Sequence, residues 1–154
     1  MTMIERLLSL AQDLAEASDG SLTMKRQAVS TAYYAVFHAL AKLCADEMLG
    51  GRKSAPEDEY VRVYRALEHG TIKTAFKAAP LVSVAELQHI GNRAAVLQSE
   101  RIRSDYLPSQ ALYTRDQCRT LVEAAKSAVR SISALPARDR KSLAVHLLFK
   151  NRPL

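Results

Sequence analysis

The chain has 154 residues, of which 48% are hydrophobic and 25% charged, and its net charge is +6 at pH 7. This length and hydrophobic content predict one globular domain with a substantial core. No apolar run approaches the roughly 18 residues that cross a bilayer, and charges spread through the N-terminal segment are untypical of a signal peptide. We therefore expect a cytoplasmic protein without membrane association, whose positive charge allows an acidic partner such as a nucleotide, RNA or an acidic protein.

Apolar residues recur at helical spacing along the whole chain, and capping or turn residues divide this pattern into segments. No segment alternates apolar and polar residues over the length of a strand. The expected helices cover residues 3–17, 22–49, 57–68, 72–78, 84–104, 115–133 and 137–150. This pattern predicts an all-α fold, an up-down bundle of four to five helices over 1–135. The amphipathic C-terminal helix, within 136–154, is an addition expected to pack on the bundle or on a partner.

Local signals mark where these helices begin and end. Ser54 and Ser83 each precede a glutamate by three residues, a capping-box pattern that predicts a helix start. Thr71 and Thr114 are expected to cap the helices that follow them. His69 is predicted to end the third helix, its ring satisfying free carbonyls there. Breaks between helices are expected at residues 18–20, 50–51, 107–113 and 135–136.

The most informative stretch is Arg26–Leu40, inside the long second helix. Residues four apart on a helix are neighbours on one face, so a single stripe carries a cation, a hydroxyl, a phenol and an imidazole. Its members are Arg26, Ser30, Tyr34 and His38. Such a stripe can hold an anion, a nucleotide or a scissile phosphate, or it can form an internal polar network.

A second polar group lies near the end of the helix expected at 84–104. Arg101 and Asp105 are four residues apart and can pair with each other, or they can face the Arg26 stripe across the bundle. One interpretation is an ion pair that fixes a helix end. The other is a polar cleft between helices, where arginine and histidine meet a phosphate.

Tyr33 and Tyr34 offer a possible stacking surface for bases. Adjacent residues on a helix point roughly 100° apart, so we expect one ring to face the core or a subunit interface and the other to be free. Cys44 and Cys118 have no metal-ligand spacing and are expected to be reduced, buried thiols. We expect neither a metal site nor a cofactor.

Three motifs resemble those of the HEPN superfamily (higher eukaryotes and prokaryotes nucleotide-binding), and in particular its small stand-alone prokaryotic members. They are R-Q-A-V-S-T-A-Y-Y-A-V-F-H from Arg26, then H-G-T-I-K-T-A-F from His69, and R-I-R-S-D-Y from Arg101. The similarity in order and spacing covers about residues 5–133. It implies a helical bundle that pairs as a homodimer.

Many members of that superfamily are metal-independent RNases of toxin–antitoxin, abortive-infection or CRISPR systems, with an R-x4-6-H signature. In this chain neither Arg93 nor Arg101 is followed by a histidine at that spacing. The resemblance therefore implies first a dimeric module that binds a nucleotide, RNA or a protein partner. That partner would be nucleotidyltransferase-like or another defence protein.

Two alternatives to this binding module stay open, a metal-independent RNase acting at the dimer cleft and a purely structural interaction protein. The catalytic candidates for the RNase are Arg26, His38 and Arg101. The candidate ligand-binding residues of the site are Arg26, Ser30, Tyr33, Tyr34, Arg103, Asp105 and Tyr106.

Overall fold

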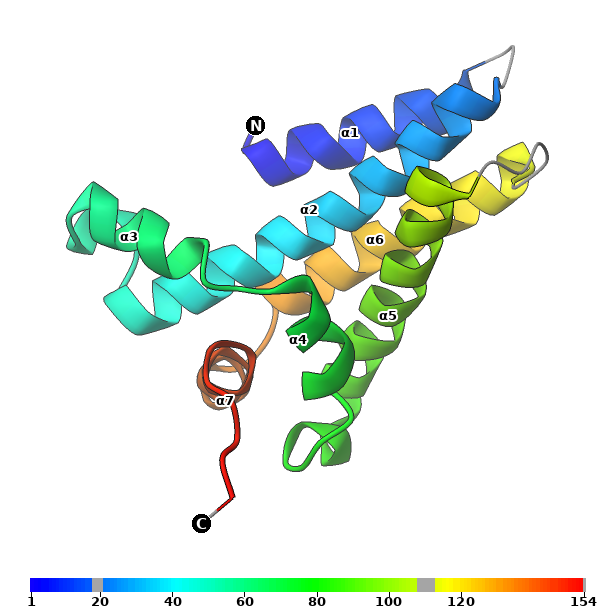
Figure 1. The fold of residues 1–154 in the computed structure, drawn as a ribbon. Coiled ribbons are helices and arrows are strands. Elements are labelled where there is room, and N and C mark those ends of the chain that lie inside the picture. Colours follow the sequence, from blue (N-terminus) through cyan, green and yellow to red (C-terminus); the bar gives the residue numbers. More distant parts are fainter. Residues whose placement is uncertain (18–20, 108–112, 154) are drawn as a thin grey trace.

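The computed structural model describes residues 1–17, 21–107 and 113–153. These residues form seven α-helices and two 3-10 turns, with no strand among them, which confirms the predicted all-α bundle (Figure 1). The elements are α1 (Met3–Glu16), α2 (Leu22–Leu49), η1 (Arg52–Ser54), α3 (Glu57–Tyr64), α4 (His69–Ala75), η2 (Leu81–Ser83), α5 (Ala85–Tyr106), α6 (Arg115–Ser133) and α7 (Ala137–Leu148).

Helix α2 is the centre of the bundle. It contacts α1, α3, α5, α6 and α7, and half of its residues are buried. A helix that is apolar on nearly every side has to be surrounded by other helices, and the alanines and valines of α2 allow them to approach closely. Ser21 caps its start by accepting the Met24 N–H at 3.2 Å. Gly50 ends it in the left-handed conformation, with φ of 77°, which glycine adopts without steric cost.

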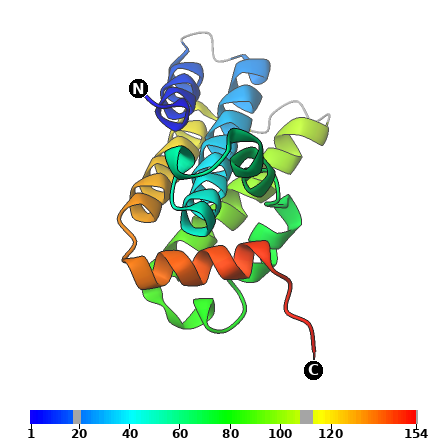
Figure 2. The ribbon, with the colours of Figure 1, turned by 90° about the vertical axis from the view of Figure 1, so that its left-hand side faces the viewer.

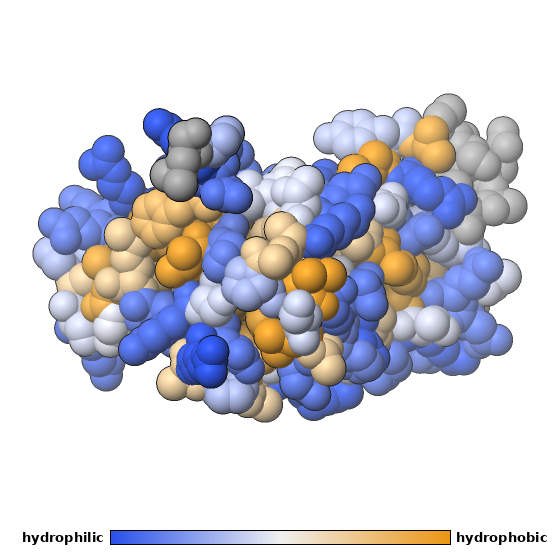
Figure 3. Space-filling model, turned by 90° about the horizontal axis from the view of Figure 1, so that it is seen from below, coloured by the Kyte–Doolittle hydropathy of each residue, from blue (hydrophilic) through white to orange (hydrophobic). Residues whose placement is uncertain are grey.

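The short helices α3 and α4 and the C-terminal helix α7 pack around the C-terminal half of α2 and the start of α5. Helix α7 crosses beneath the long helices and contacts α2 and α4 (Figure 2). Its apolar side chains Leu143 and Leu147 are buried, so the C-terminal helix packs on the bundle itself. Seen from below, the surface has several small apolar patches separated by polar side chains (Figure 3). None of the described helices is long and apolar enough to cross a membrane.

The predicted helix bounds hold closely for the long helices and fail around α3 and α4. Helix α3 ends at Tyr64 instead of residue 68, because the chain leaves the helical path to bring Leu67 into the core. Helix α4 begins at His69, with Glu68 and not Thr71 at the N-cap position. His69 therefore starts a helix, and the expectation that it ends one is wrong.

Two predicted caps are also wrong, and one is confirmed. Ser54 and Ser83 lie in 3-10 turns, and the helices after them begin without a side-chain cap. The Ser54 hydroxyl donates instead to the carbonyl of Gly50 at 2.9 Å, because a helix end leaves carbonyls unsatisfied. Thr114 caps α6 as predicted and forms a capping box with Gln117. The break expected at 18–20 and most of the one at 107–113 lie outside the described residues.

Candidate functional site

The contact between α2 and α5 brings the two predicted polar groups together around Arg101. The guanidinium carbon of Arg101 lies 5.2 Å from the ring centroid of Tyr33 and 5.9 Å from that of Tyr34. Both distances are within the range of cation–π attraction. The residue is 9% exposed, and its Nη1 donates to Asp105 at 3.5 Å. Arg101 is thus a positioned cation between two aromatic rings, weakly paired with one carboxylate.

Asp105 also links the end of α5 to the start of the α2 stripe. It accepts the hydroxyl of Ser30 at 2.6 Å. One turn earlier on α2, Nη1 of Arg26 donates to the backbone carbonyl of Ser104 at 3.0 Å. These bonds fix the last turn of α5 against α2, as the helix-pinning interpretation expects, and they hold the Arg101 side chain in register with the tyrosines.

His69 is the residue of this cluster that the sequence interpretation missed. Its Nδ1 is 2.6 Å from the hydroxyl of Tyr33, and its ring stacks on Phe37 with centroids 4.4 Å apart. Gln98 donates to the His69 carbonyl at 2.8 Å and so holds the start of α4 on α5. The glycine after His69 indicates a helix end, so His69 is not among the predicted site residues. The segment H-G-T-I-K-T-A-F, which begins at His69, is the sequence signal that could have marked it.

The protonation states around His69 follow from burial. Desolvation lowers the pKa of His69, and the positive charge of Arg101 lowers it further. Burial raises the pKa of Tyr33 to about 12, so this phenol keeps its proton at neutral pH. A neutral His69 that accepts this proton at Nδ1 carries its own hydrogen on Nε2. Within the described part of the chain, His69 Nε2 has no hydrogen-bond partner.

The two neighbouring tyrosines point in different directions, as expected. Tyr33 is 0% exposed, and a ligand arriving from solvent cannot stack on it. Tyr34 is half-buried and lies over Arg101 at the edge of the cluster. Of the two predicted stacking residues, Tyr34 alone can meet a ligand directly, while Tyr33 holds Arg101 and His69 in place.

His38 lies at the edge of this cluster, where its ring meets that of Phe37 edge-on with centroids 5.9 Å apart. It is twelve residues after Arg26 on the same helix, which places the two about 18 Å apart along the axis. Its Nδ1 is 2.6 Å from the hydroxyl of Tyr64 on α3, and burial lowers its pKa. It lines a cavity of about 530 Å³ between the start of α1, the second half of α2 and the later part of α3. The structure therefore does not bring the predicted catalytic pair of Arg26 and His38 together.

Arg103 and Tyr106 lie outside the cluster. Arg103 pairs with Glu100 at 3.1 Å, and Tyr106 is 73% exposed. Residues two or five positions after Arg101 cannot share its helix face, because the helical period is 3.6 residues. These two members of the predicted binding set stand on the outer surface of α5.

Two buried polar atoms in the site have no partner among the described residues, the Nε of Arg101 and the Oε1 of Gln98. Native structures leave few such atoms, so a partner from outside the chain is one explanation for them here. Metal ligation has no comparable support, since the described residues contain no group of three or more histidine, cysteine, aspartate or glutamate side chains that could hold an ion. Cys44 and Cys118 are free and buried in the core.

Comparison of the chain with protein-family models, with curated proteins and with solved structures found no match.

Proposed function

We propose that this chain is a cytoplasmic, dimeric, HEPN-like module that binds the phosphate of a nucleotide or of RNA. The observation that carries the proposal is the setting of Arg101, whose guanidinium lies against Tyr33 and Tyr34 with His69 beside them. An arginine held by aromatic rings loses little conformational entropy when it binds an anion, and its planar N–H groups match a phosphate.

The surroundings of Arg101 favour an anionic ligand. The Asp105 contact at 3.5 Å is long for a charge-assisted hydrogen bond, so it neutralises the guanidinium only in part. Tyr34 and His69 are half-buried beside the arginine and supply a stacking ring and an N–H donor. The net charge of +6 attracts polyanions at longer range.

Binding to RNA and nucleotide tests this proposal directly. Fluorescence anisotropy with a labelled single-stranded RNA and calorimetry with ATP, both in EDTA and at low salt, should show saturable binding of at least one of them. Arg101→Gln should weaken it at least tenfold. The matched control is Arg103→Gln, two residues on and exposed, which should have little effect. Equal affinities of the two variants, or no binding of either ligand by the wild-type protein, would refute the proposal.

The HEPN resemblance adds two expectations to this function. The chain should form a homodimer, and its protein partner should be nucleotidyltransferase-like or another component of a toxin–antitoxin or defence system. Light scattering at micromolar concentration tests the first. A single species at the chain mass of 17.0 kDa would contradict it.

A second candidate function is metal-independent RNA cleavage, with His69 in place of His38. The observation in its favour is a neutral imidazole with a free Nε2 next to the Arg101 cation. Such a pair can transfer a proton at the 2′-hydroxyl or the leaving group while arginine stabilises the phosphate charge. Cleavage should then persist in EDTA. His69→Ala should slow it about 10²–10⁴-fold, whereas His38→Ala should not. Cleavage that depends on His38 and not on His69 would contradict this assignment and support Arg26 and His38 as the catalytic residues.

A further inference from the structure

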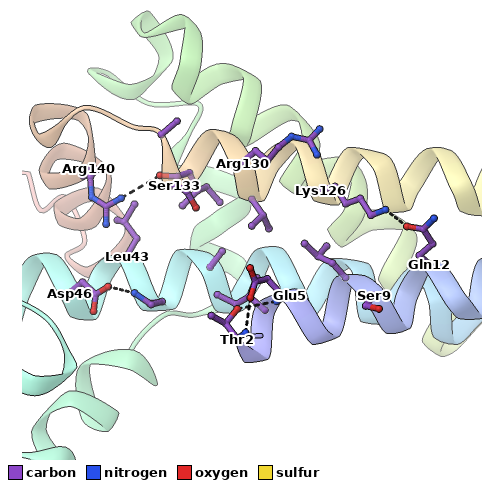
Figure 4. A pocket seen from close by; sticks show the side chains of 17 residues that line it. Thr2, Glu5, Ser9, Gln12, Leu43, Asp46, Lys126, Arg130, Ser133 and Arg140 are labelled. Carbon is purple, nitrogen blue, oxygen red and sulfur yellow. Dashed lines mark hydrogen bonds and ion pairs between the residues drawn. The ribbon is translucent and has the colours of Figure 1, made fainter.

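A long groove runs between α1 and α6, with α2 as its floor. Its volume is about 870 Å³, at the upper end of the range for ligand sites. Side chains of α1 and α6 face each other across it, and Gln12 and Lys126 close one end (Figure 4). Asp46 and Arg140 lie at the other end. The groove is separate from the Arg101 cluster and shares no residue with it.

The inside of the groove is apolar. Five of the large aliphatic side chains that line it are Ile4, Leu8, Leu43, Val129 and Ile132. The three residues on α1 and α6 that are only partly buried, Ile4, Leu8 and Val129, leave part of their surface to solvent. Binding of a partner's amphipathic helix, with its apolar face in a hydrophobic groove, is a recurring mode of protein recognition.

The acidic side chains of the groove are already satisfied within the chain. Glu5 accepts the backbone N–H of Thr2 at 2.6 Å in the capping box of α1. Asp46 accepts from Lys42 and, at 2.8 Å, from the hydroxyl of Tyr60. Neither carboxylate therefore needs a cation from a ligand.

The cationic side chains are in excess and less fully paired. The groove is lined by four cations and two acids. Arg140 binds Glu47 at 2.8 Å, and Lys126 has a long 3.4 Å contact with the exposed Glu123. The exposed guanidinium of Arg130 has no hydrogen bond or ion pair among the residues described in the structure. The rim is therefore positive, with Arg130 available for a carboxylate.

We infer that this groove docks an acidic amphipathic helix of a partner protein. The apolar face of that helix lies on the aliphatic floor, and its glutamate or aspartate side chains pair with Arg130 and Lys126. The eleven residues from Thr2 to Gln12 span about 15 Å, which is nearly three turns of a docked helix. The inference does not depend on the phosphate site, because the two surfaces share no residue.

Charge argues against the other occupants. The C-terminal segment Lys150–Pro153 is basic and lies beyond α7, so it does not complement a positive rim. A second copy of the chain also carries a net charge of +6. An acidic helix from a different protein is the one occupant that satisfies both the floor and the rim.

The test uses a fluorescent peptide of about 15 residues with leucine at helical spacing and glutamate elsewhere. The wild-type protein should bind this peptide saturably at low salt, and circular dichroism should show that the peptide becomes more helical when it binds. Two control peptides, one with the same residues scrambled and one with lysine in place of glutamate, should bind at least roughly tenfold more weakly.

Charge reversal then locates the binding surface. Arg130→Glu should weaken binding of the acidic peptide roughly tenfold. The matched control Arg138→Glu reverses an exposed charge in the first turn of α7, where a glutamate suits the helix dipole. It should leave affinity unchanged, and both variants should melt like the wild-type protein. Equal affinity of the two variants would overturn the inference. The inference would also be overturned if the protein bound RNA, if Arg130→Glu abolished that RNA binding, and if the acidic peptide did not compete with the RNA. RNA binding through Arg101 should be unaffected by Arg130→Glu, so the two proposals fail separately.

Discussion

Substitution of Gly91 on α5 tests how closely α4, the helix that carries His69, packs against α5. A Cβ added at Gly91 would lie 2.5 Å from Cγ and 2.6 Å from Cβ of Phe76, the residue that ends α4. Atoms at this separation overlap, and Phe76 is itself buried. Because one of the contacted atoms is the Cβ of Phe76, a rotamer change cannot relieve the clash. The end of α4 would have to move away from α5.

The net effect of Gly91→Ala is the difference between two opposing terms. Alanine in a helix interior gains about 1 kcal/mol over glycine. Overpacking of a core contact costs about 1–3 kcal/mol, and an overlap this close belongs at the upper end. We expect a net loss of about 1–2 kcal/mol in the free energy of unfolding. For a chain of this size that lowers the melting temperature by about 3–7 °C.

Gly70, one residue after His69, is the matched control. It also lies in a helix, α4, and an added Cβ there meets nothing within 4 Å. Gly70→Ala should therefore stabilise the protein, by up to about 1 kcal/mol. Urea denaturation followed by circular dichroism measures both variants. If Gly91→Ala also stabilises the protein, α4 does not pack on α5 as described.

Three further predictions concern single groups. Asp105→Asn should lower the free energy of unfolding by about 1–2 kcal/mol in urea titrations, because the Asp105 side chain is 31% exposed and its shortest hydrogen bond is to Ser30. This is less than the loss expected for a fully buried ion pair. An unchanged urea midpoint would show that the bond to Ser30 contributes nothing to stability. Burial lowers the pKa of His38 and His69 below about 6.5. Because the unfolded chain then binds more protons than the folded one, the melting temperature should fall as the pH drops from about 7 to 5.5. A melting temperature that does not change over this pH range would contradict the burial of the two histidines. Burial raises the pKa of the Cys44 thiol to about 12. A disulfide reagent at mildly alkaline pH should therefore label neither buried cysteine until denaturant is added. Rapid labelling of the native protein would show that the core opens.

The sequence by itself determined the helical class and the long elements, because helical periodicity and local caps depend on residues close together in the chain. The span of α2 from residue 22 to 49 and the capping of α6 by Thr114 were both predicted. The divergence of Tyr33 and Tyr34 followed from the helical period alone. So did the possible pairing of Arg101 with Asp105, one turn apart on α5.

The tertiary structure decided which of these side chains meet. Leu67 turns into the core, which ends α3 early and delivers His69 to Tyr33, 36 residues away in the chain. No local signal carries that contact, since it depends on the packing of α4 against α2 and α5. His38 shares a stripe with Arg26 but is separated from it by the length of three helical turns. A helical stripe fixes direction around the axis, and only the packing of neighbouring helices decides which part of the stripe becomes a site.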